Sequence, residues 1–140
     1  MKNIVFSLYM IGSLCFFVGT ALAWWTEAAA GRDAGQWEGA PDSEWYASLI
    51  QPDSGSSCCG EGDAWFADDT EVGPNGETIA IITDTRDDEP RKRRHIPPGT
   101  TFIIPPEKVR KHPSANPTGH NVIFIGTDNN VLCWEPTAKG

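Results

Sequence analysis

Short runs of β-branched and aromatic residues, separated by glycine and proline, follow one another through the second half of the chain. Residues 63–72, which include Trp65, are predicted as one strand, and residues 77–85 (ETIAIITDT) carry the strongest strand pattern. The Asn75-Gly76 pair between them is typical of a tight hairpin turn. We therefore expect these two strands to form an antiparallel hairpin.

Three further strands are predicted closer to the C-terminus. They cover residues 99–104, 121–125 and 130–134. The last two flank a turn at residues 126–129, which favours a second hairpin. Residues 106–112 are predicted as a short helix, because a proline suits its first turn and another proline follows it.

One amphipathic helix is predicted between Pro41 and Pro52. Trp45 and Leu49 lie four residues apart and so share a face, and Pro52 ends the helix. The pattern as a whole predicts a mainly β (α+β) fold. It has one N-terminal helix and about five short antiparallel strands in a small sheet or a partly open barrel.

The first 23 residues have the pattern of a secretory signal peptide. Lys2 precedes an apolar run over residues 4–18, and Ala21-Leu22-Ala23 is a small-x-small cleavage site. An uncleaved membrane anchor is the alternative, although the run is shorter than the roughly 20 residues that span a bilayer. We expect cleavage after Ala23, an irregular arm over residues 24–40, a single domain over residues 41–137, and a secreted or periplasmic location.

Cleavage would remove Cys15 and leave Cys58, Cys59 and Cys133. Export to an oxidising compartment favours a disulfide that joins Cys133 to Cys58 or Cys59. Cys58 is preferred, because Gly60 allows the chain to turn just after Cys59. Cys59 would then be a reduced thiol or an alternative partner for Cys133. A bond between the two adjacent cysteines or their capture of a metal is disfavoured, and no metal and no cofactor is predicted.

The chain is acidic, with a formal net charge of −8, which argues against nucleic acid as a partner. One basic run, Arg91-Lys92-Arg93-Arg94, directly follows the acidic residues 87–89. We expect the two runs to offset each other in one solvated loop. Contact of the basic run with an anionic surface is the alternative.

Six tryptophans are many for 140 residues. Trp45, Trp65 and Trp134 are expected to pack in the core, and a binding face for a carbohydrate or peptide is the alternative. The histidines are expected to be exposed loop residues; they are His95, His112 and His120. The sequence contains no nucleophile elbow, P-loop, dinucleotide-binding glycine motif or zinc-protease motif.

Several short motifs resemble a group of small exported bacterial proteins, some of them phage-associated, without an assigned activity. The motifs are Trp45 to Leu49, Pro52, Ser57-Cys58-Cys59 with Asp63, residues 104–108, residues 116–119 and residues 131–134. The resemblance covers about residues 45–135 and implies export and a single fold. This chain has Ala64 where the group has a further cysteine, so the resemblance implies that Cys59 lacks the partner it has in those proteins.

These observations predict an exported binding or structural module of the cell envelope. Its partner would be an envelope protein or polymer, and a membrane would be involved only through an uncleaved signal segment. An exported enzyme or thiol-redox protein that uses the remaining cysteine is the alternative function. A cleft that brings a cysteine beside a histidine would favour that alternative.

Overall fold

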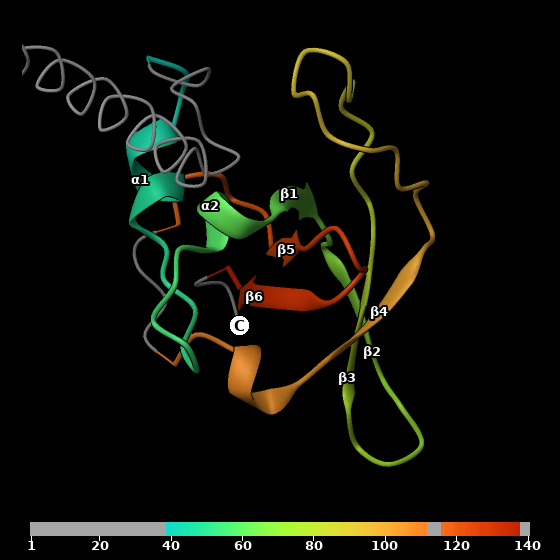
Figure 1. Cartoon of the computed structure of the whole chain (residues 1–140). Coiled ribbons are helices and arrows are strands. Elements are labelled where there is room, and N and C mark those ends of the chain that lie inside the picture. Colours follow the sequence, from blue (N-terminus) through green and yellow to red (C-terminus); the bar gives the residue numbers. More distant parts are fainter. Residues whose placement is uncertain (1–38, 112–115, 138–140) are drawn as a thin grey trace, which may run out of the picture. The chain divides into compact units, whose positions relative to one another are not determined.

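A computed structural model describes residues 39–111 and 116–137, which belong to one compact unit of the chain. The predicted signal peptide, residues 24–38 of the predicted arm and His112 lie outside the described residues. The fold is mainly β, as predicted from the sequence. Its described part has six short antiparallel strands in two open three-stranded sheets, together with two short α-helices (Figure 1).

The first sheet has the strand order β1-β5-β6. Its strands are β1 (Asp63–Phe66), β5 (Val122–Ile125) and β6 (Val131–Glu135). β5 and β6 form the hairpin predicted around residues 126–129, and every residue of both strands is buried. Burial of both faces explains why residues 122–125 and 131–134 are apolar throughout.

The second sheet has the strand order β2-β3-β4. Its strands are β2 (Asp69–Val72), β3 (Thr78–Ile81) and β4 (Thr101–Ile104). The predicted hairpin around Asn75-Gly76 is present, and Gly76 adopts the positive φ of 82° that the turn requires. β2 is exposed at all of its residues, which is typical of an edge strand.

The prediction of a single strand over residues 63–72 is wrong, because this segment divides between the two sheets. Phe66 pairs with Val122 in the first sheet, and the N–H of Ala67 donates to the carbonyl of Asn121 over 3.0 Å. Asp69 then pairs with Ile81 in the second sheet. The described residues therefore contain six strands, and the segment between β1 and β2 connects the sheets.

The helices are short. α1 (Ser43–Ser48) occupies the predicted position and ends before Pro52. α2 (Cys58–Glu61) was not predicted, and it begins where the Ser57 hydroxyl accepts a hydrogen bond from the N–H of Gly60 over 3.0 Å. The helix predicted over residues 106–112 is a single 3₁₀ turn, η1 (Pro106–Lys108). No helix in the described ranges is both long and apolar enough to cross a membrane.

The disulfide joins Cys58 of α2 to Cys133 of β6, and both cysteines are fully buried. It lies within a cluster that also contains Leu49, Phe124 and Leu132. A second cluster packs around Trp65 and Trp134 together with apolar residues of the second sheet. The disulfide thus connects the helical segment to the last strand of the first sheet.

Candidate functional site

A cleft of about 500 Å³ lies where four segments meet. The start of α1, the segment from α2 through β1, the loop after β3 and the loop before β5 each line one part of it. A volume of this size accommodates a small molecule. The residues that line the cleft are Ala40, Pro41, Asp42, Ser43, Tyr46, Cys59, Gly62, Asp63, Ala64, Phe66, Arg86, Arg91, Arg93, Pro117, Thr118 and His120.

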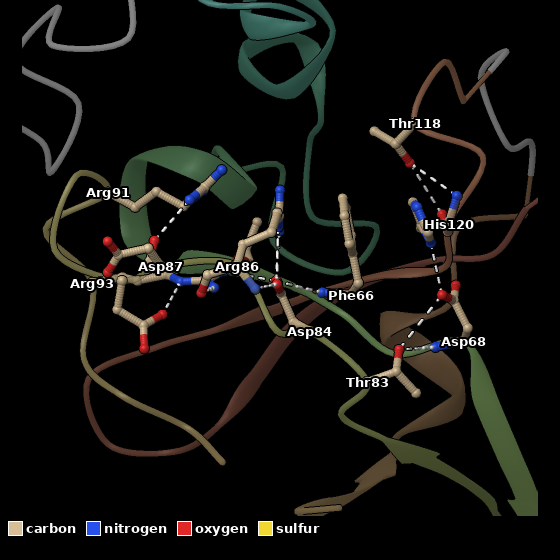
Figure 2. A network of polar contacts seen from close by, with 12 residues as sticks. Phe66, Asp68, Thr83, Asp84, Arg86, Asp87, Arg91, Arg93, Thr118 and His120 are labelled. Atoms are coloured by element: carbon tan, nitrogen blue, oxygen red, sulfur yellow. Dashed lines mark hydrogen bonds and ion pairs between the residues drawn. The ribbon is translucent and has the colours of Figure 1, made fainter. Parts of the chain in front are cut away.

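Asp84 is buried and does not itself line the cleft, but its contacts orient the arginines that do (Figure 2). Its fully buried carboxylate accepts hydrogen bonds from the guanidinium of Arg86 over 2.6–3.1 Å and from Nη1 of Arg93 over 2.9 Å. The backbone N–H groups of Phe66 and Arg86 donate to the same carboxylate over 3.1 and 2.9 Å. The Asp84 carboxylate is therefore held as an anion by two cations and two peptide groups.

The pKa of Asp84 reflects two opposing effects. Burial raises the pKa, but the hydrogen bonds from Arg86, Arg93 and the backbone outweigh burial and hold it well below the ordinary value of an aspartate. Asp84 is consequently charged at neutral pH, even though its side chain is excluded from solvent.

The expectation of one solvated loop is wrong for Arg93, whose residue is only 8% exposed. Its Nε pairs with Asp88 over 2.5 Å, and its guanidinium also donates to the carbonyls of Ala64 and Arg86. Asp88 does offset part of the basic run, as the sequence predicted. The decisive partner is the buried Asp84, which is why Arg93 lies inside the domain.

The other members of the basic run differ from one another. Arg91 is half-buried and lines the cleft, and its Nη1 donates to the backbone carbonyl of Asp87 over 2.7 Å. Burial and the neighbouring charges of Arg86 and Arg93 lower the pKa of Arg91. Lys92 is exposed, and Nη2 of Arg94 donates to the carbonyl of Gly126 over 3.2 Å. The four consecutive basic residues therefore differ in burial and in hydrogen-bond partners, and they do not form one basic surface patch.

Phe66 lies between Arg86 and His120 in the cleft (Figure 2). The Arg86 guanidinium carbon lies 3.5 Å from the centre of the Phe66 ring, and the His120 ring stacks on Phe66 with 4.1 Å between ring centres. Nδ1 of His120 lies 2.7 Å from a carboxylate oxygen of Asp68. These contacts fix the orientation of Phe66 and His120 in the cleft wall.

Tyr46, in α1, also lines the cleft. Burial raises the pKa of the Tyr46 hydroxyl, and the charge of Arg86 and a hydrogen bond with it oppose this effect. The Tyr46 ring packs edge-on against Phe124, with 6.1 Å between ring centres. The hydroxyl is thus an uncharged polar group at the cleft, and the ring belongs to the core.

The tryptophans proposed for binding lie elsewhere. Trp65 and Trp134 are 1% and 4% exposed, so both pack in the core and do not form a binding face. Trp45 is half-buried beside Tyr46, with 4.9 Å between the ring centres. His95 and His120 are partly exposed loop residues, as expected, but each pairs with an aspartate, Asp88 and Asp68 respectively.

Cys59 lies outside the disulfide, is half-buried and lines the cleft. The cleft therefore contains both a cysteine and a histidine, Cys59 and His120. In the part of the chain that the structure describes, no group of three His, Cys, Asp or Glu residues is arranged to hold a metal.

Asp84 and Arg86 form the centre of this site, and neither residue was predicted as a site residue from the sequence. The signal that could have found them is the Asp-x-Arg spacing at the end of a strong strand, followed within seven residues by Arg93. Comparisons with models of protein families, with curated proteins and with solved structures found no match to this chain. The resemblance to the exported Ser-Cys-Cys proteins stays a prediction.

Proposed function

We propose that this protein is an exported binding module and that the cleft is its ligand site. The observation that carries the proposal is the rigid lining: Arg86 and Arg93 are oriented by the buried Asp84, and Phe66 is held between Arg86 and His120. A cleft whose polar groups are already oriented loses little conformational entropy when a ligand binds. The disulfide supports the export part of the proposal, because such bonds persist in oxidising compartments.

The test is a fragment screen by NMR on the chain as the host exports it, with a library of neutral, cationic and anionic fragments. We expect the bound fragments to shift the backbone amides of cleft residues such as Asp63, Phe66 and Thr118. The amides of the turn at Asn75-Gly76, on the second sheet, serve as the control. Hits scattered over the surface, or no hits at the cleft from any class, would contradict the proposal.

Cys59 distinguishes this proposal from the thiol-redox alternative, since it lines the same cleft. A binding module tolerates Cys59→Ser, with fragment affinities changed less than about threefold. In a thiol-redox protein the Cys59 thiolate would attack a disulfide probe such as oxidised glutathione, which forms a Cys59–glutathione mixed disulfide and releases one glutathione thiol, and added dithiothreitol as reductant would regenerate the Cys59 thiol; Cys59→Ser would abolish this exchange. Reduction that depends on Cys59 would replace the binding proposal with the redox one.

A further inference from the structure

We propose that the cleft binds a small organic monoanion, a single carboxylate on an apolar body, and that Arg91 receives the carboxylate. This inference rests on the proposed function, since it names the ligand class of the same cleft. It adds a specific role for one arginine of the basic run.

Arg91 is the guanidinium of the cleft whose Nε and Nη2 edge is still available. Arg86 directs that edge at Asp84, and Arg93 directs all three of its nitrogens at Asp84, Asp88 and backbone carbonyls. Arg91 makes one side-chain hydrogen bond within the described residues, from Nη1 to the backbone carbonyl of Asp87. Its Nε and Nη2 groups make none there, and together they present the planar fork that matches a carboxylate.

The surrounding charges leave Arg91 without a carboxylate of its own. The carboxylates of Asp84 and Asp88 pair with Arg86 and Arg93, and Arg91 makes no ion pair within the described residues. Asp87 offers Arg91 its carbonyl, while its carboxylate accepts the N–H of Glu89 over 3.1 Å. Burial, and after it the charges of Arg86 and Arg93, lower the pKa of Arg91, and an anionic ligand beside the guanidinium would offset these effects.

The remaining lining defines the rest of the ligand. Pro41, Ala64, Phe66 and Pro117 supply apolar surface beside the arginines. An apolar body of the ligand would cover this surface, which fits the usual composition of small-molecule sites. A simple inorganic anion would leave the apolar part of the cleft in contact with water.

The charge of the ligand follows from the ion pairs of the arginines. Arg86 and Arg93 pair with Asp84 and Asp88, whereas Arg91 makes no ion pair within the described residues. One guanidinium without an ion pair matches one negative charge, so the second charge of a dianion or the charges of a polyanion would lie uncompensated in the cleft. This distinguishes the proposal from contact of the basic run with an anionic surface.

The test compares three probes of one shape in NMR titrations of the exported chain: benzoate, neutral benzamide and dianionic phenyl phosphate. We expect benzoate to shift the cleft amides and to bind at least about tenfold more tightly than either other probe, as a charge-assisted bidentate pair allows. Arg91→Gln should weaken benzoate about tenfold or more. Lys92→Gln is the matched control, because it removes the same charge from the adjacent exposed residue, and it should change the affinity less than twofold.

Each contrary result overturns the inference in an identifiable way. Equal affinity for benzamide and benzoate, or equal effects of Arg91→Gln and Lys92→Gln, excludes a carboxylate held by Arg91. Tighter binding of phenyl phosphate than of benzoate excludes the monoanion. Neutral or cationic fragments that bind the cleft when benzoate does not would leave the proposed function intact and remove only this inference. No fragment of any charge class at the cleft would remove both.

Discussion

Asp84 shows how one buried carboxylate can fix the geometry of a surface cleft. Its oxygens accept hydrogen bonds from Arg86, Arg93 and two backbone N–H groups, so its loss would leave two arginines without their common partner. We expect Asp84→Asn to lower the free energy of unfolding at pH 7 by about 3 kcal/mol, as for the breaking of a buried ion pair. Urea unfolding measures this. Asp69→Asn, on the exposed strand β2, is the control and should change stability by less than about 0.5 kcal/mol.

The same residue predicts a dependence of stability on pH. The pKa of Asp84 is lowered on folding, so the unfolded chain takes up a proton at a higher pH than the folded chain does. The stabilisation by Asp84 is therefore complete above about pH 5 and is lost as the pH falls through about 4 and below. Urea unfolding of wild type and Asp84→Asn over this range should show the stability difference narrowing towards acid. A constant difference would contradict the assignment.

Arg93 gives a second prediction at the residue scale, because the loop hypothesis treated it like its neighbours. Arg93→Gln removes one of the two arginine partners of buried Asp84 and should destabilise the domain by about 3 kcal/mol. Lys92→Gln, an exposed position, should change stability by less than about 0.5 kcal/mol. Thermal and urea unfolding of both variants measures the contrast. If Arg93→Gln and Lys92→Gln both change stability by less than about 0.5 kcal/mol, the expectation of a solvated loop would hold for Arg93 as well.

The sequence could not distinguish these arginines because their difference is not local. Arg91, Lys92 and Arg93 are adjacent and all basic, and the nearest acidic run at residues 87–89 offers an obvious set of partners. The partner that decides the burial of Arg93 is Asp84, on the other side of that run. Only the path of the loop after β3 brings the two together, and charge pattern does not encode that path.

At the scale of elements, the sequence predicted what depends on short-range pattern. The hairpins β2-β3 and β5-β6 have turn residues and apolar runs close together in the chain, and both are present. The division of residues 63–72 depends on contacts far along the chain. The carboxylate of Asp68 accepts the N–H of Asn121 over 2.9 Å where the chain leaves the first sheet. An uninterrupted strand pattern contains no sign of such a contact.

The start of β1 provides a prediction about element packing. Gly62 is buried where α2 ends, and a Cβ added there would lie 2.7 Å from Cδ1 of Leu132 and 2.8 Å from the carbonyl oxygen of Ile125. Because the Ile125 oxygen is backbone, the clash cannot be relieved by a side-chain rotation alone. We expect Gly62→Ala to destabilise the domain by about 1–3 kcal/mol. Urea unfolding measures the loss. The double variant Gly62→Ala/Leu132→Ala should still be less stable than Leu132→Ala alone, because the clash with the Ile125 carbonyl oxygen remains.

At the scale of the whole chain, processing is a prediction that follows from the sequence alone. Ala21-Leu22-Ala23 ends the apolar run, so the exported protein should begin at Trp24. N-terminal sequencing or intact-mass measurement of protein from the exporting compartment checks this. Recovery of a chain that begins at Met1 in the membrane fraction would support the anchor alternative.

The disulfide is the covalent link between distant parts of the chain, and it gives the last prediction. Cys58 and Cys133 are 75 residues apart, so their bond restricts the unfolded chain by up to about 4 kcal/mol on the chain-entropy account. That is a large fraction of the roughly 5–15 kcal/mol by which domains are stable. We expect Cys58→Ala/Cys133→Ala to lose a few kcal/mol in urea unfolding, and Cys59→Ala to lose less than about 1 kcal/mol.

The effect of the covalent constraint on stability can be distinguished from the effect of removing the two sulfur atoms. Both cysteines are fully buried, so the double variant also leaves small cavities, whereas wild type unfolded under reducing conditions keeps every atom and loses only the constraint. If the constraint dominates, reduced wild type should be nearly as unstable as the double variant. Peptide mapping without reduction should recover Cys58 linked to Cys133. A Cys59–Cys133 linkage would move the thiol out of the cleft to position 58, and the Cys59→Ser test of the redox alternative would then have to be repeated at Cys58.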